Sequence, residues 1–377
     1  MKDTKTYTFT AKTVAGVEEI LAGELLNAGA RNIAILKRAV AFEGDKELMY
    51  RTNYCCSTAL RILMPVKSFP IEKQDDLYDQ VNQIPWEDYL DSEMTLAVDA
   101  VNNTSVFTNS QFVAMRTKDA IVDRFRSAGK LRPSVDLDNP DVRVNIHIYK
   151  EICDVSLDSS GGSLHKRNYR KSAGIAPMNE VLAAGLVRLS GWDPSKSLTD
   201  PMCGSGTILI EAAMMANHIP SGYFRKNFGF MKWPDFDESL WNKVREAEDA
   251  KIRQEDTALF GSDISGKSIQ SAKENLLFTG LTNQIPLELA AFGSASQKMA
   301  PGFLIFNPPY DERLQVDDLV AFYKEIGDIL KKKYTGNEAW IISSDLRALK
   351  FVGLHPSKKI IVFNGPLECR FVRFSLY

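Results

Sequence analysis

The stretch that decides the fold runs from Asp200 to Thr207 and reads D-P-M-C-G-S-G-T. It follows a short strand-like segment and precedes a helix-like one at 208–217, so we expect a loop that joins a strand to a helix. Gly204 and Gly206 let the backbone turn sharply and come close to a ligand. The free N–H groups at the helix start would face a carboxylate of that ligand. A tight turn without a ligand is the alternative, and the leading aspartate favours the ligand site.

A second acidic residue supports a nucleoside cofactor. Asp263 ends the next strand-like segment, where a carboxylate can accept hydrogen bonds from both ribose hydroxyls. An aspartate at this place can also serve only as a helix N-cap. The gap between the glycines and Asp263 is longer than the about 20 residues of the dinucleotide fingerprint, which disfavours NAD. Residues 219–241, with their Pro, Gly and aromatic residues, would be an insertion in this gap.

The second half of the chain alternates strands and helices around this loop. Strands are expected at residues 197–199, 258–262, 285–290, 303–306, 339–343 and 359–363. The clearest helix covers 319–334, with its apolar residues on one face. This alternation predicts a mostly parallel sheet with helices on both faces. The chain closes with a strand, Asn364-Gly365-Pro366 and a strand at 368–376, an antiparallel hairpin that is typical of class I methyltransferases.

The strongest catalytic motif is Asn307-Pro308-Pro309-Tyr310, directly after the expected strand at 303–306. An exocyclic amine on a nucleobase is a poor nucleophile, because its lone pair is delocalised into the ring. If the Asn307 amide oxygen and the Pro308 carbonyl each accept one N–H, the nitrogen is oriented and pyramidalisation is favoured. The two prolines stiffen the loop, and Tyr310 could stack on a base flipped out of its helix. A Pro-Pro loop that only caps a strand is the alternative.

The first half of the chain predicts an α+β module. Strands are expected at 6–12, 33–37, 39–43 and 60–66, with a helix at 14–28 and another before the last strand. This βαββαβ order is ferredoxin-like. A strand at 94–101, a helix at 111–126 and a strand at 143–149 continue the module. Residues 154–162, rich in Ser, Asp and Gly, are expected to be the linker to the second half.

The pairing of D-P-M-C-G-S-G-T with N-P-P-Y resembles the THUMP-domain RNA methyltransferases, and almost the whole chain takes part. The segment at 112–125 resembles the THUMP helix; similarly placed motifs are 132–136, 163–167, 176–180, 228–230 and 312–314. The bacterial 23S rRNA guanine-N2 methyltransferases that act at position 2445 are the most similar group. Asn168 and Asp311 stand where this family usually has Gly, and both residue types tolerate positive φ. In 289–292 we find no acidic residue to read the cofactor's adenine.

The resemblance implies an α/β Rossmann-like class I methyltransferase, with a mixed seven-stranded sheet and a terminal antiparallel hairpin, preceded by an α+β ferredoxin-like/THUMP module. The expected units are residues 1–66 (ferredoxin-like), 67–156 (THUMP, RNA-binding) and 163–377 (methyltransferase). The implied cofactor is S-adenosyl-L-methionine, and the implied product is N2-methylguanosine. The implied partner is structured RNA, with 23S rRNA or a pre-50S particle favoured.

The expected site residues fall into three groups. The catalytic group is Asn307, Pro308, Pro309 and Tyr310. The cofactor-binding group is Asp200, Pro201, Cys203, Gly204, Ser205, Gly206, Thr207, Asp263, Ile264, Pro177, Glu180 and Phe292. The RNA-binding group is Arg116 and Lys118 from the THUMP helix, Lys166, Arg167 and Arg170 from the domain junction, and Arg313 from the 312–314 motif after N-P-P-Y.

The amino-acid composition excludes some classes of protein but does not identify the function. Five cysteines without metal-type spacing and a chain without a long apolar run predict a reduced, cytoplasmic protein with no metal and no membrane segment. A net charge of −2 shows that any RNA-binding surface must be local. A tRNA guanine-N2 methyltransferase, a DNA adenine-N6 methyltransferase and a non-catalytic RNA-binding assembly factor remain alternatives. The oligomeric state is open.

Overall fold

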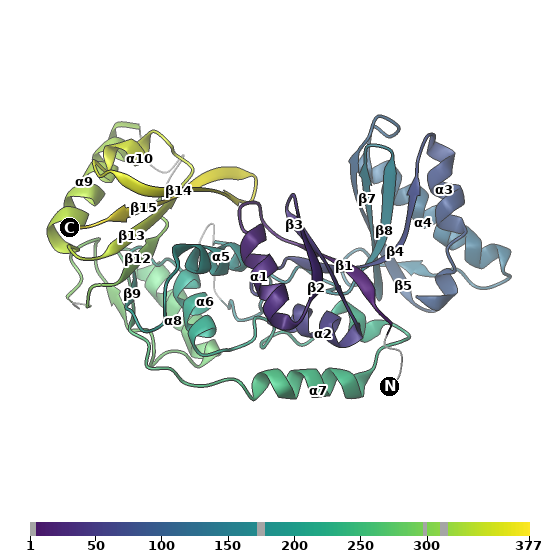
Figure 1. The fold of residues 1–377 in the computed structure, drawn as a ribbon, viewed down its shortest axis with the longest axis horizontal. Helices are drawn as coiled ribbons and strands as arrows, with labels where there is room; N and C mark the ends of the chain where they lie inside the picture. Colours follow the sequence, from purple (N-terminus) through teal and green to yellow (C-terminus); the bar gives the residue numbers. More distant parts are fainter. Residues whose placement is uncertain (1–4, 172–177, 297–299, 310–315) are drawn as a thin grey trace.

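The computed structural model describes residues 5–171, 178–296, 300–309 and 316–377. The chain is elongated, with its two sheets at different places along the long axis (Figure 1). The sheet of the second half lies at one end, and the sheet of the first half fills the middle and the other end. None of the described helices is long and apolar enough to cross a membrane.

The first sheet has eight strands in the order β2-β3-β1-β4-β8-β7-β5-β6. Its β2-β3-β1-β4 part has the ferredoxin-like order, as expected from the βαββαβ pattern. The elements of that part are β1 (Tyr7–Lys12), α1 (Glu18–Ala28), β2 (Arg31–Leu36), β3 (Ala39–Gly44), α2 (Lys46–Cys55) and β4 (Arg61–Pro70). The rest consists of α3 (Gln74–Asn82), η1 (Trp86–Asp88), β5 (Thr95–Asn103), α4 (Ser110–Ser127), β6 (Ser134–Val135), β7 (Val142–Tyr149) and β8 (Ile152–Asp158).

The expected linker at 154–162 is wrong over its first half, because β8 runs through it. Cys153, Val155 and Leu157 alternate with more polar residues and are buried, which is the pattern of a strand with one face on the core. β8 pairs with both β4 and β7. The polar residues between them, which suggested a loop, lie on the opposite face. β4 therefore belongs to both parts of the sheet, and the boundary expected between residues 66 and 67 falls inside it.

The second sheet has seven strands in the order β11-β10-β9-β12-β13-β15-β14, with β15 antiparallel to both of its neighbours. This is the mixed sheet with a terminal hairpin that the sequence predicts. Its strands are β9 (Leu198–Asp200), β10 (Leu259–Asp263), β11 (Leu287–Leu289), β12 (Phe303–Phe306), β13 (Glu338–Ser343), β14 (Pro356–Asn364) and β15 (Leu367–Ser375). The helices of this half of the chain are α5 (Glu180–Ser190), α6 (Thr207–Ala216), η2 (Gly229–Lys232), α7 (Glu238–Asp249), α8 (Gly266–Thr279), α9 (Val316–Lys333) and α10 (Ala348–Phe351).

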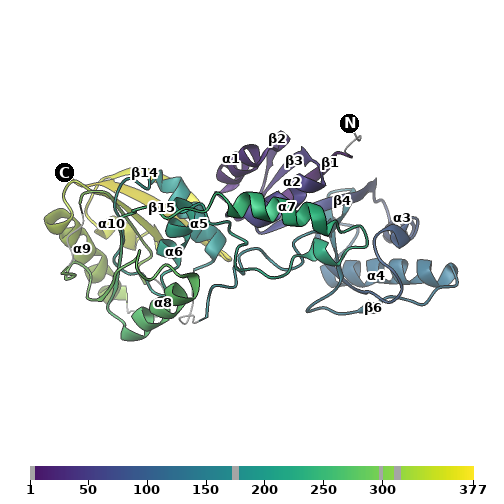
Figure 2. The ribbon, with the colours of Figure 1, turned by 90° about the horizontal axis from the view of Figure 1, so that it is seen from below.

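The expected insertion after α6 leaves the second sheet and completes the core of the first. Helix α7 lies beneath the ferredoxin-like part in Figure 1, is seen in front of it from below in Figure 2, and packs against α2. Phe228, Phe230 and Trp241 belong to the same buried cluster as the core of the first sheet. The Tyr50 ring centroid lies 4.4 Å from that of Phe230, and the Tyr54 centroid 5.4 Å from that of Trp241.

The first half of the chain also contributes residues to the core of the second half. Val14 and Val17, from the first half of the chain, are buried in the core cluster of the second half. Gly185 on α5 makes room for Val17, because a Cβ at Gly185 would come within 2.9 Å of Val17 Cγ1. A fragment that begins near residue 163 would expose the aromatic rings of the insertion to water. RNA binding by the first half must therefore be studied in the full chain.

We expect Trp241→Ala to lower the free energy of unfolding by about 3–5 kcal/mol, the usual cost of truncating a buried tryptophan. Because this ring joins the two halves, both halves should be destabilised together. Denaturant unfolding followed by far-UV circular dichroism measures the change. Tyr377→Ala, at a side chain that is 99% exposed, is the matched control and should change it by less than about 0.5 kcal/mol. A cost below 1 kcal/mol for Trp241→Ala would contradict this interlocked packing.

Candidate active site

Three adjacent parallel strands bring the expected site residues to one edge of the sheet. β9 pairs with β10 on one side, where Asp200 lies opposite Gly261, and with β12 on the other, where Thr199 lies opposite Leu304. Continuing these registers places Asp263 on one side of the loop after β9 and Asn307 on the other. Adjacent strands are about 4.8 Å apart, so one ligand can reach all three segments. The carboxyl edge of a parallel sheet is where such folds bind ligands.

The glycine loop has the backbone that the sequence predicts. Gly204 and Gly206 have φ of +55° and +80°, which side-chain-bearing residues rarely adopt. The Gly204 N–H donates to Asp263 Oδ2 at 2.9 Å, and the Cys203 N–H donates to the Ser262 carbonyl at 2.9 Å. A Cβ built on Gly204 would meet no atom within 4 Å. The loop is thus tied to the end of β10 and has open space beside Gly204.

Asp200, the first residue of the loop, is a buried acid. Asp200 is 2% exposed, and among the described residues no lysine or arginine forms an ion pair with it. Burial, with Asp263 as a smaller cause, raises the pKa of the Asp200 carboxyl well above its usual range. A cationic ligand group beside Asp200 would reverse this effect, because it favours the carboxylate. The α-ammonium of S-adenosylmethionine is such a group, so the open loop and the buried Asp200 both fit this cofactor.

Arg170 was expected to contact RNA, and the structure instead gives it a place behind the cofactor loop. Its guanidinium donates to Ser205 Oγ and Thr207 Oγ1, each at 3.1 Å, and to the Met178 carbonyl at 2.9 Å. It also pairs with Glu180 at 2.9 Å, and its side chain is only 16% exposed. The expectation of phosphate contact is therefore wrong, because the donors of Arg170 are used within the protein. Charge alone could not separate these roles in the sequence.

Arg167 was also expected to contact RNA, and that expectation is wrong for the same reason. Its side chain is 1% exposed and pairs with Glu211 on α6 at 3.4 Å. It also donates to the Leu164 carbonyl and to the Ser57 carbonyl in the first half of the chain. Tyr169 Oη donates to the same Glu211 at 3.0 Å. Arg167 thus joins the cofactor helix to the loop before β4.

The other expected cofactor residues lie around the loop. Pro201, Cys203, Ser205 and Thr207 are buried in or beside it, and Glu180 begins α5. Ile264, next to Asp263, is 77% exposed and offers an apolar surface at this edge. Phe292 is half-buried and stacks on Tyr334 with 5.8 Å between ring centroids, so one face of its ring is already covered.

The remaining expected residues are at the surface or outside the described chain. Lys166 is exposed at the domain junction, and Asn168 has a φ of +71°, as its place in a glycine position predicts. Arg116 and Lys118 are partly exposed on α4, where they pair with Asp75 and Asp119. Pro177, Tyr310 and Arg313 lie outside the described residues.

Asn307 presents an unused acceptor at the site. Its Oδ1 atom is buried and has no hydrogen-bond partner among the described residues. It directly follows the fully buried Phe306 at the end of β12, and Pro308 is buried beside it. A buried acceptor without a partner costs about 1–3 kcal/mol, so such atoms in folded proteins usually have a ligand or water. The arrangement suits a ligand that donates an N–H.

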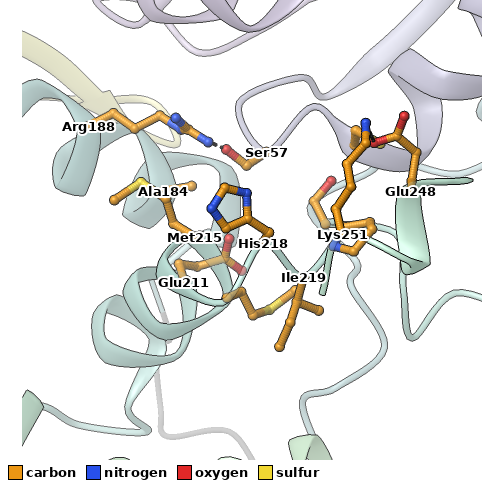
Figure 3. A pocket seen from close by; sticks show the side chains of 13 residues that line it. Ser57, Ala184, Arg188, Glu211, Met215, His218, Ile219, Glu248 and Lys251 are labelled. Carbon is orange, nitrogen blue, oxygen red and sulfur yellow. Dashed lines mark hydrogen bonds and ion pairs between the residues drawn. The ribbon is translucent and has the colours of Figure 1, made fainter. Parts of the chain in front are cut away.

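A cavity of about 160 Å³ lies elsewhere, between the two halves of the chain. Figure 3 shows it with His218 near its centre, Arg188 and Ser57 on one side, and Lys251 and Glu248 on the other. Met215 lines it near the C-terminal end of α6, roughly 12 Å along the helix from the cofactor loop at 1.5 Å per residue. Its lining includes no residue of the loop at 200–207, nor Asp263 or Asn307, so the cavity is distinct from the site at the carboxyl edge.

Three family profiles match successive parts of the chain: the RlmL ferredoxin-like domain at 8–63, the THUMP domain at 72–158 and the RMKL-like methyltransferase domain at 167–373. A Synechocystis protein named as a candidate RNA methyltransferase is 39% identical over the whole of both chains. The ribosomal RNA large subunit methyltransferase K/L of Syntrophotalea carbinolica is 37% identical over 98% of this chain. The chain spans 53% of that relative's length.

Among solved structures, the candidate methyltransferase SMU.472 in complex with SAH has a TM-score of 0.87 and 29% identity. The match covers 100% of this chain and 99% of that one. The expected class I methyltransferase fold and the expected cofactor, S-adenosylmethionine, are thereby confirmed.

We expect Gly206→Val to abolish S-adenosylmethionine binding, because valine is strained at a φ of +80° and its side chain would distort the loop. Isothermal titration calorimetry measures the loss. Gly191→Val is the matched control, since Gly191 has a φ of +73° with open space around it and lies at the end of α5, away from the loop. Unchanged affinity in Gly206→Val would remove the loop from the cofactor site.

We expect Arg170→Gln to weaken S-adenosylmethionine binding about tenfold, because a tenfold change corresponds to 1.4 kcal/mol, the scale of a lost charge-assisted hydrogen bond. The methylation rate at saturating cofactor should change little, since Arg170 contacts the loop from behind. Steady-state kinetics with varied cofactor separates KM from kcat. Lys350→Gln, at an exposed residue on α10, is the control. If Arg170→Gln weakened only RNA binding and left cofactor binding unchanged, the expectation that Arg170 contacts RNA would be correct after all.

Proposed function

We propose that this chain, which belongs to the RMKL-like family of THUMP-domain RNA methyltransferases, methylates the exocyclic N2 amine of a guanine in RNA. The product would be N2-methylguanosine. The observation that carries this proposal is the buried Asn307 Oδ1 at the carboxyl edge of the sheet, beside the cofactor loop; this oxygen has no hydrogen-bond partner among the described residues. An amine hydrogen of the target base would donate to this oxygen.

The proposed chemistry depends on orientation and hydrogen bonding. When bound, S-adenosylmethionine supplies a methyl group on a positively charged sulfur, so no strong base is needed. Asn307 Oδ1 and the Pro308 carbonyl would accept the two amine hydrogens and favour the pyramidal nitrogen. Pro308 and Pro309 hold both acceptors in a stiff backbone before the base arrives. Tyr310 would stack on the flipped base.

The substrate proposal is 23S rRNA, at a guanine of the 2445 type, free or in a pre-50S particle in the cytoplasm. It is supported by the K/L relative, which is named for the large ribosomal subunit, and by the matching THUMP domain. We further propose residues 1–66, 67–156 and 163–377 as the functional units. Arg116, Lys118 and Lys166 keep their proposed phosphate contacts, because all three are at least partly exposed.

We expect Asn307→Ala to lower the single-turnover methylation rate by about 10²–10³, the usual effect of removing one transition-state hydrogen bond. Affinities for cofactor and RNA should change little, because neither ground-state complex requires that bond. Asn307→Asp should keep partial activity, since a carboxylate also accepts hydrogen bonds. Rapid-quench assays on rRNA measure the rates. Asn283→Ala, at an exposed asparagine after α8, is the control. An undiminished rate in Asn307→Ala would contradict the assignment.

Mass spectrometry of nucleosides identifies the product and the RNA. In a deletion strain, N2-methylguanosine should fall by one residue per 23S rRNA and return on complementation with the wild-type chain, but not with Asn307→Ala. If N2-methylguanosine were lost from tRNA and not from rRNA, the chain would be a tRNA guanine-N2 methyltransferase. Appearance of N6-methyladenosine as the product would overturn the guanine proposal, and an unchanged set of nucleosides would favour an assembly factor.

A further inference from the structure

We propose that the outer surface beside the cofactor loop binds a single-stranded segment of the substrate RNA by base stacking. The surface consists of an aromatic ridge, defined here as Tyr223, Phe224 and Phe278, with the lysines Lys166, Lys171 and Lys226 around it. This inference rests on the proposed function only in taking RNA as the substrate. None of the three ridge residues has a role in the site described above.

The ridge is a continuous row of rings. The centroids of Tyr223 and Phe224 are 5.1 Å apart, and those of Phe224 and Phe278 are 5.7 Å apart. Tyr223 is 46% exposed and Phe278 41% exposed, whereas Phe224 is partly buried and also contacts the buried Tyr169. The inner ring thus anchors two outer rings, each of which presents ring surface to solvent. Leu277, next to Phe278, is 75% exposed.

Helix α8 packs on the core of the second half without the side chains of Leu277 and Phe278. Its buried apolar residues are Ile269, Ala272 and Leu276, of which Ile269 and Leu276 belong to the core of the second half. Leu277 and Phe278 lie outside that face, at the exposed C-terminal end of the helix. Grouped exposed apolar side chains usually mark a surface that contacts a partner. Aromatic rings in particular provide stacking surfaces for unpaired bases.

The charges around the ridge favour RNA over an apolar protein partner. Lys171 Nζ lies 4.0 Å from the centroid of the Phe278 ring. Lys166 and Lys226 are exposed, and the Arg225 guanidinium, which donates to the Lys166 carbonyl at 2.9 Å, holds their two segments together. Within the described parts of the chain, none of these three lysines forms an ion pair with a carboxylate. Unpaired ammonium groups beside exposed rings match the alternating phosphates and bases of a single strand.

Hydrogen bonds connect this surface to the cofactor loop. Asn275, one turn before Phe278 on α8, accepts from the Lys171 N–H at 2.8 Å and donates to the Ser205 carbonyl at 3.1 Å. Arg170, the neighbour of Lys171, donates to Ser205 Oγ. The ridge is therefore fixed relative to the loop by a few bonds. RNA held there would be the strand that flanks the target nucleotide. The target base must be unpaired to enter the site, and a flank that is also single-stranded would leave its bases free to stack on the ridge.

The test measures binding of a fluorescein-labelled 12-nucleotide single-stranded RNA by anisotropy, with the same sequence annealed as a duplex. We expect Tyr223→Ala and Phe278→Ala each to weaken single-strand binding about tenfold, the usual effect of one lost base stack, and to leave duplex binding unchanged. Lys171→Ala and Lys226→Ala should each lower the salt dependence of log Kd by about 0.7 per lost phosphate contact. The aromatic variants should not change that slope.

The matched controls are Phe351→Ala, at a phenylalanine that is 44% exposed on α10, and Lys350→Ala beside it. All variants should bind S-adenosylmethionine like the wild type, which shows that they are folded. Single-strand affinities that are unchanged in both aromatic variants, or a wild type without measurable single-strand binding, would overturn the inference. Such a result would leave the proposed function intact if N2-methylguanosine still forms in rRNA, whereas failure of the proposed function would appear as the absence of that nucleoside.

Discussion

Parallel pairing of β9 with β10 on one side and with β12 on the other is the constraint from which the site follows. The three strands are far apart in the sequence, yet their carboxyl ends must meet at one edge once the ladder forms. That edge joins the glycine loop, Asp263 and Asn307. The bond from the Gly204 N–H to Asp263 then fixes the loop against β10. The glycine loop and the end of β10 are both needed to form the cofactor site.

The sequence allowed much of this arrangement to be predicted, because local chemistry determines it. Positive φ requires glycine at Gly204 and Gly206, and the strands of the second sheet are found within about three residues of their expected bounds. Contacts between side chains that are far apart in the chain could not be predicted from the sequence. In the sequence Arg167 resembles a surface charge, because its partner Glu211 lies 44 residues later. Only the fold shows the two side chains paired in the core. The aromatic insertion was recognised, but its packing partners on α2 could not be.

The two halves of the chain share their cores, and this determines how RNA can be presented to the catalytic edge. Trp241 completes one core and Val17 the other, so separation of the halves would expose apolar surface on both. Arg167 adds a polar link from the cofactor helix to the Ser57 carbonyl. The RNA-binding units proposed here would therefore stay at a constant spacing from Asn307 during turnover.

The buried acceptor at Asn307 also has a consequence for selectivity among bases. An oxygen on the ligand at that place would meet a second oxygen with no hydrogen between them, and both would lose their hydration. A uracil, whose Watson–Crick edge carries carbonyls where other bases carry an amine, would be rejected by repulsion as well as by its lack of a nucleophilic nitrogen. The proposed site would thus discriminate between bases before any bond to carbon is made.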